Sequence, residues 1–187
     1  MSDFEYQLLC HTSPTLAGIK VSNLFSFPKE QLPQYRQEIK YYNAQMKERD
    51  LCIDYIYSCS GRIFVLVYRK KRLKDTLSHS KTASFLMSEG YPDPRSSDLA
   101  QIINQLRRRA NHCQEFPHEI GFFLGYPADD VLEFIHQKGR NYKLCGYWKV
   151  YFDEESARET FLAYSSARDH LLEKARAGSP VFSLIAV

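Results

Sequence analysis

Apolar and polar residues follow two spacings along the chain, and each spacing predicts a different kind of element. Apolar residues at every second position predict a half-buried strand over residues 19–27. Leu51 to Arg69 contains two apolar arms around Ser60-Gly61. This predicts a hairpin whose second arm, apolar on both faces, lies in the centre of a sheet. Further strands are predicted at Glu119–Tyr126, Leu144–Phe152 and Val181–Val187.

Apolar residues spaced three or four apart predict amphipathic helices between these strands. A short opening helix, Phe4–Cys10, is expected to end before Pro14. Longer helices are predicted over residues 30–49, 73–88, 97–109, 127–139 and 153–177. Adjacent strands with helices interspersed predict an α+β fold. We expect one domain over residues 1–187, with a mixed, largely antiparallel sheet and helices packed on it.

The composition is that of an ordinary globular protein. Of 187 residues, 44% are hydrophobic and 25% are charged, and the formal net charge is +3. The five cysteines include no C-x-x-C pair, which argues against a disulfide framework or a zinc site and favours free thiols in a reducing cytoplasm. No signal-peptide pattern opens the chain, and no run approaches the ~20 apolar residues of a membrane span. We therefore expect a cytoplasmic protein with no membrane partner and no metal site.

The first candidate site lies near the N-terminus. Cys10 next to His11 could be an activated nucleophile or a ligand, whereas a buried cysteine at a helix end is the structural alternative. The turn from Thr15 to Gly18 could present backbone N–H groups to an anion, with Lys20 beside it. This turn lacks the spacing of a phosphate-binding P-loop, so the motif is weak.

The second candidate site is the stretch from His118 to Tyr151. His118 could bind a metal or transfer a proton, but no H-E-x-x-H pattern follows, and a strand-end histidine hydrogen-bonded to a loop is the favoured interpretation. If residues 144–152 form one strand, Trp148 belongs to the core face, and Tyr147, Lys149 and Tyr151 belong to the other. Such a stripe could stack a flat ligand, or it could lie under a helix.

Basic residues gather at Arg69–Lys74 and at Arg107–Arg109. Clusters of this kind contact phosphates in nucleic-acid-binding proteins. Cations also stabilise the C-terminal end of a helix, which accounts for the arginine triplet. A solvated surface is the favoured interpretation, and nucleic-acid binding is kept as an alternative.

Several long motifs resemble one bacterial family. These are the opening CHTSPTLAGIKVSNLFSF, the segment HEIGFFLGYP, and KGRNYKLCGYWKVY. They resemble the uncharacterised family known as domain of unknown function 3793, over about Cys10 to Tyr164. The resemblance implies a protein of anaerobic or facultative bacteria, encoded near flavodoxin or iron-related genes. It therefore implies a link to redox or iron physiology and a flavodoxin-like redox partner. It supplies no catalytic residues.

The sequence thus predicts a non-catalytic binding or accessory protein for a small anionic or planar cofactor. The expected ligand contacts are Cys10, Thr15, Lys20, His118, Tyr126, Tyr147, Trp148 and Lys149. An enzyme that uses Cys10 or His118 is the first alternative. A nucleic-acid-binding protein that uses the basic clusters is the second.

Overall fold

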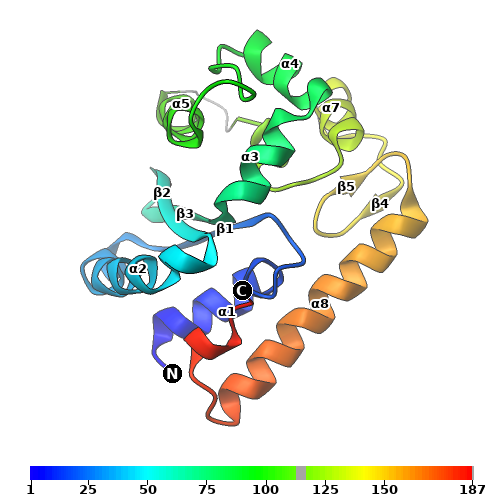
Figure 1. Cartoon of the computed structure of the whole chain (residues 1–187). Helices are drawn as coiled ribbons and strands as arrows, with labels where there is room; N and C mark the ends of the chain where they lie inside the picture. Colours follow the sequence, from blue (N-terminus) through cyan, green and yellow to red (C-terminus); the bar gives the residue numbers. More distant parts are fainter. Residues whose placement is uncertain (113–116, 187) are drawn as a thin grey trace.

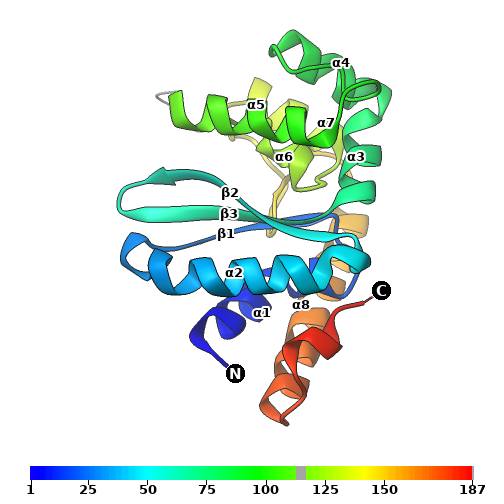
Figure 2. The ribbon, with the colours of Figure 1, turned by 60° about the vertical axis from the view of Figure 1, so that its left-hand side comes forward.

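A three-stranded antiparallel sheet forms the centre of the computed structural model, which describes residues 1–112 and 117–186. The strands are β1 (Ser22–Pro28), β2 (Leu51–Cys59) and β3 (Arg62–Arg69), in the order β1-β3-β2. Figures 1 and 2 show this sheet between two layers of helices. The predicted α+β fold, the hairpin and the central position of its second arm are confirmed.

Both faces of the sheet are buried, because β3 supplies apolar side chains to each. Val65 and Val67 join the core on one face, whereas Leu66 and Tyr68 join the core on the other. The first face is covered by α1 (Asp3–Leu16), α2 (Leu32–Met46), α8 (Glu154–Arg176) and the 3-10 helix η3 (Val181–Leu184). The second is covered by α3 (Lys70–Ser78), α4 (Ser80–Ser88), α5 (Leu99–His112), α6 (Ile120–Phe123) and α7 (Ala128–His136). Short 3-10 turns, η1 (Lys29–Gln31) and η2 (Lys47–Arg49), flank α2.

The opening helix is longer than predicted, since α1 continues through Pro14 to Leu16. Proline removes the N–H that would donate to the carbonyl of Cys10 one turn earlier, which disfavours a helix here. The hydroxyl groups of Thr12 and Ser13 donate to backbone carbonyls one turn earlier. Every residue from Thr12 to Leu16 is buried, so tertiary packing outweighs the local preference for a break.

The strand predicted at Glu119–Tyr126 is wrong, because residues Ile120–Phe123 form the short helix α6. All four residues of α6 are buried. A short apolar run that is buried on every side has no periodicity by which a strand and a helix can be distinguished. Gly121 allows α6 to contact α7, since an added Cβ would lie 2.8 Å from a methyl carbon of Val131.

The single strand predicted at Leu144–Phe152 is also wrong. Only β4 (Leu144–Cys145) and β5 (Lys149–Val150) are paired, and they form a small antiparallel hairpin. The chain reverses at Gly146, whose N–H donates to the carbonyl of Trp148 over 3.0 Å. Because the chain reverses here, the side chains of residues 144–152 do not alternate between two faces of one strand as predicted.

Two further boundaries differ from the prediction. Residues 73–88 form two helices, α3 and α4, which are separated at His79. The predicted C-terminal edge strand is instead η3, which Arg49 holds through the carbonyls of Phe182 and Ile185. The last residue of that predicted strand, Val187, lies outside the described residues. Among the helices that the structure describes, none is long and apolar enough to cross a membrane.

Candidate functional site

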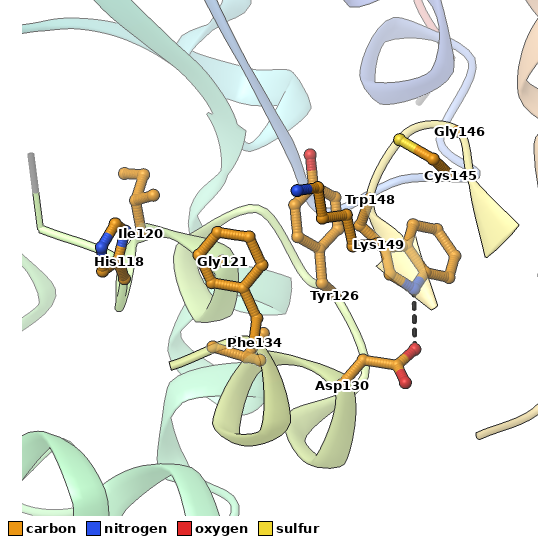
Figure 3. A pocket seen from close by; sticks show the side chains of 11 residues that line it. His118, Ile120, Gly121, Tyr126, Asp130, Phe134, Cys145, Gly146, Trp148 and Lys149 are labelled. Atoms are coloured by element: carbon orange, nitrogen blue, oxygen red, sulfur yellow. Dashed lines mark hydrogen bonds between the residues drawn. The ribbon is translucent and has the colours of Figure 1, made fainter. Parts of the chain in front are cut away.

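An apolar pocket of about 310 Å³ opens between the α6–α7 unit and the β4–β5 hairpin (Figure 3). We call it the hairpin pocket. It is lined by His118, Ile120, Gly121, Tyr126, Asp130, Val131, Phe134, Cys145, Gly146, Trp148 and Lys149. Pockets of this size and lining, mostly apolar with a few polar groups, are typical of small-molecule sites.

Aromatic rings form the walls of the hairpin pocket. Tyr126 and Trp148 are stacked, with ring centroids 5.3 Å apart and an interplanar angle of 28°. The ring of His118 meets Phe134 edge-on at 5.2 Å. Figure 3 shows His118 on one side of the pocket and Trp148 with Cys145 on the other. Such walls favour a flat ligand, which can stack on the rings.

Lys149 supplies a positive charge beside these rings. Its Nζ donates to the carbonyl of Gly139 over 2.7 Å and lies 5.7 Å and 4.7 Å from the ring centroids of Phe134 and Tyr142. Among the described residues, Lys149 forms no ion pair with a carboxylate. Its charge is therefore available to an anionic group in the pocket.

Asp130 fixes the hairpin against α7. Its side chain is 4% exposed, and it accepts hydrogen bonds from Trp148 Nε1 at 2.8 Å and from the backbone N–H of Tyr151 at 2.9 Å. The first bond is drawn in Figure 3. Asp130 also lies in the first turn of α7, where a negative charge is favourable. The structure adds that it sets the orientation of the indole.

A second, more polar depression lies between α1, β1, α8 and the hairpin. We call it the α1–α8 groove, and its volume is about 600 Å³. It is lined by Cys10, His11, Asn23, Leu24, Leu124, Tyr126, Gly146, Tyr147, Phe161, Ser165 and Arg168. Tyr126 and Gly146 line both cavities, so they belong to the wall that separates them.

Lys20 and Thr15 are both buried and are absent from the lining of either cavity. The Nζ of Lys20 donates to the backbone carbonyls of Ser22 and Leu124. Burial lowers the pKa of Lys20 to about 7. Thr15 donates to the side chain of Asn23 over 2.7 Å. The anion-binding turn proposed at 15–18 is not formed, because the backbone N–H groups that follow Thr15 donate to carbonyls at the end of α1.

The predicted ligand contacts therefore divide between two places. His118, Tyr126, Trp148 and Lys149 meet in the hairpin pocket. Cys10 and Tyr147 line the α1–α8 groove, where Tyr126 joins them. Cys10 and His118 lie in different cavities, so they do not form one nucleophile–base pair.

The aromatic stripe predicted for Tyr147, Lys149 and Tyr151 is not a common face. Tyr147 lines the groove, Lys149 lines the pocket, and Tyr151 is 6% exposed. The hydroxyl of Tyr151 is buried without a hydrogen-bond partner in the described part of the chain. The prediction failed because the turn at Gly146 replaces an extended strand.

Several cavity residues had no signal that sequence reasoning used. In the sequence, Phe134 belongs to the apolar side of a predicted helix, and Phe161 and Arg168 have no feature that distinguishes them from other residues of the last helix. Gly146 was the one detectable signal, because a glycine inside a strand pattern often marks a bend or a close contact. An added Cβ there would lie 2.1 Å from the ring of Phe161.

The basic clusters contribute largely to internal contacts. Arg69 is buried and donates to backbone carbonyls at the end of α1. Lys74 donates to carbonyls of the 94–97 loop. Arg109 pairs with Glu89 at 2.7 Å and with buried Glu119. These internal contacts account for Arg69, Lys74 and Arg109, so nucleic-acid binding is not needed to explain them.

No group of three or more His, Cys, Asp or Glu side chains is placed to hold a metal ion within the described residues. No curated protein and no solved structure matches the chain. The model of the family described as "Protein of unknown function (DUF3793)" matches residues 8–185. This range is nearly the whole chain and includes all residues that line the pocket and the groove. The resemblance expected from the motifs is thereby confirmed, and the chain belongs to the DUF3793 family.

Proposed function

We propose that the protein is a non-catalytic binding protein whose hairpin pocket takes a small, flat, largely apolar ligand with a negative charge at its edge. One observation carries the proposal: an aromatic-walled pocket lies next to the cation of Lys149, which has no carboxylate partner among the described residues. The rings of Tyr126, Phe134 and Trp148 supply stacking surface, and Lys149 supplies the charge that selects an anion.

The lining supports binding more than catalysis. Its polar side chains are few, and Asp130 is occupied by the indole N–H and backbone N–H groups. His118 contacts the ring of Phe134, and it forms no hydrogen bond with Cys145 within the described structure. A nucleophile needs a base within hydrogen-bond reach, and this pocket lacks that arrangement.

Planar anions of this kind include many redox cofactors. The proposal therefore includes a role in cytoplasmic redox or iron physiology, with a flavodoxin-like protein as the partner. The free thiols of Cys10, Cys52, Cys59 and Cys145 are consistent with a reducing compartment.

Fluorescence of Trp148 gives a direct test, because it is the single tryptophan of the chain. The probe pair is the anion 8-anilinonaphthalene-1-sulfonate and its neutral relative N-phenyl-1-naphthylamine. We expect both to quench Trp148, with the anion bound more tightly. Lys149→Met should weaken anion binding about tenfold, the loss expected for a hydrogen bond to a charged group, and leave the neutral probe unchanged.

The control is Lys143→Met, which removes an exposed lysine of the same hairpin that does not line the pocket. Phe134→Ala should weaken both probes, since it removes a wall. Near-ultraviolet circular dichroism of each variant verifies that the fold is intact. Equal affinity for the two probes, or the same anion affinity in Lys149→Met as in the unmodified protein, would refute the proposal.

A further inference from the structure

We propose that the α1–α8 groove is a second binding site, which takes the oxyanion group of a small ligand with a flat ring. The groove is larger and more polar than the hairpin pocket. Its charged and hydrogen-bonding groups come from elements distant in sequence, α1, β1, the hairpin and α8, so the fold itself assembles them.

Charge is the first argument. Arg168 lines the groove with its side chain 42% exposed, and its Nε and Nη2 donate to the neighbouring Asp169 at 3.0 Å and 2.9 Å. A guanidinium has five N–H donors, so Nη1 and the remaining N–H of Nη2 stay available. No acidic side chain is among the residues that line the groove. The local charge therefore favours an anion, with Asp169 as a competing acceptor at the rim.

Asn23 is the second argument. It is 9% exposed, yet it lines the groove, and its Oδ1 accepts the hydroxyl of Thr15. This bond fixes the amide so that its Nδ2 is left to donate. No hydrogen bond from Nδ2 is formed within the described residues. A nearly buried amide that is held on one side and open on the other is a suitable donor for a ligand oxygen.

The remaining groups complete a site for a ring that carries an acid. The hydroxyls of Tyr147 and Ser165 are 3.4 Å apart, so one donates weakly to the other and the acceptor keeps its own O–H free for a ligand. The rings of Tyr147 and Phe161, with centroids 5.6 Å apart, form an aromatic wall. Arg168 and Asn23 can thus bind the oxyanion while the wall contacts the ring.

The site is distinct from the hairpin pocket, so the two can be tested separately. Consecutive residues of the hairpin turn point to opposite sides of the shared wall: Tyr147 lines the groove, and Trp148 lines the pocket. Each cavity also has its own thiol, Cys10 in the groove and Cys145 in the pocket. Failure at one site leaves the other unaffected.

The experiment measures the rate at which iodoacetamide, a neutral reagent, alkylates each thiol of the full chain, resolved by peptide mass spectrometry. Phenyl phosphate and benzoate present the same ring with a phosphate or a carboxylate, and phenol and inorganic phosphate are the single-part controls. We expect phenyl phosphate or benzoate to protect Cys10, whereas any protection of Cys145 reports on the hairpin pocket and is scored separately. Protection by only one of them identifies the oxyanion.

Two substitutions test the contacts. Arg168→Gln should raise the midpoint of protection about tenfold, the loss expected for a charge-assisted hydrogen bond. Asp169→Asn should lower it, because the competing acceptor loses its charge. Arg158→Gln is the matched control on α8, since Arg158 also pairs with a neighbouring carboxylate but does not line the groove. Absence of protection, equal protection by phenol, or an unchanged midpoint in Arg168→Gln would overturn the proposal.

Discussion

Lys20 makes the stability of this protein depend on pH above about 7. Its side chain is 3% exposed, and no carboxylate is paired with it in the described structure. Its Nζ contacts two carbonyls and lies 5.1 Å and 6.0 Å from the ring centroids of Tyr126 and Tyr164. Burial lowers its pKa from 10.5 to about 7.

The direction follows from proton binding. Between pH about 7 and pH about 10.5, Lys20 is neutral in the folded protein and charged in the unfolded chain, so the unfolded chain binds more protons. The free energy of unfolding must then rise with pH, by about 1.4 kcal/mol per pH unit for one proton. From about pH 7.5 to about pH 9 the expected gain is about 2 kcal/mol, and the full window sets an upper limit of about 5 kcal/mol.

Urea unfolding at several pH values, for the unmodified protein and for Lys20→Met, tests this reasoning. The difference in free energy of unfolding between the two proteins should grow in favour of the unmodified protein by about 2 kcal/mol over that range. Comparing the two proteins cancels the opposite contribution of Cys52, whose pKa burial raises. Lys174→Met, at an exposed position on α8, is the control and should show no such slope. Parallel pH profiles for Lys20→Met and the unmodified protein would refute the argument.

Two substitutions at the hairpin have predictable effects on stability. Gly146→Ala places a methyl group against the ring of Phe161 and should lower the free energy of unfolding by about 1–3 kcal/mol. Adding Phe161→Leu to the same chain should restore part of that stability. If urea unfolding shows that the losses of the two substitutions simply add, the two residues are not in contact. Asp130→Ala leaves the buried N–H groups of Trp148 and Tyr151 without an acceptor and should cost about 2–3 kcal/mol with a shift in Trp148 emission. Asp129→Ala, which removes only an exposed ion pair with Lys81, should lower the free energy of unfolding by less than about 1 kcal/mol. Equal losses for Asp129→Ala and Asp130→Ala would show that the hydrogen bonds of Asp130 to Trp148 and Tyr151 do not stabilise the fold.

Local patterns were sufficient for most of the scaffold. The hairpin of β2 and β3 and the long helix α8, with Asp153 as its N-cap, follow from turn chemistry, periodicity and capping. The predictions of secondary structure are wrong where the residues are buried on every side, because such segments have no periodic pattern of apolar and polar positions. Residues 120–123 are apolar on every side, and Pro14 lies in a helical turn that tertiary packing protects. In both places, long-range contacts decide a choice that short-range preferences leave open.

Of the eight ligand contacts predicted from the sequence, four line the hairpin pocket, and Thr15 and Lys20 line neither cavity. His118, Tyr126, Trp148 and Lys149 are near each other in sequence and also line one pocket, because the segment folds back as helix, helix and hairpin. The arrangement depends on Asp130, which holds the indole, and on Phe134, which faces His118. These partners are set by how the hairpin docks on α7, which no local pattern contains.

The turn at Gly146 explains why one cluster in the sequence becomes two cavities in the structure. A continuous strand would have placed Tyr147 and Lys149 on one face, whereas the tight turn sends Tyr147 toward α8 and leaves Trp148 and Lys149 toward α7. Only glycine fits at the turn, because the ring of Phe161 occupies the space of a Cβ. That ring also meets the indole of Trp148 edge-on at 4.6 Å. The ring that requires glycine at the turn therefore also contacts Trp148 in the wall between the pocket and the groove.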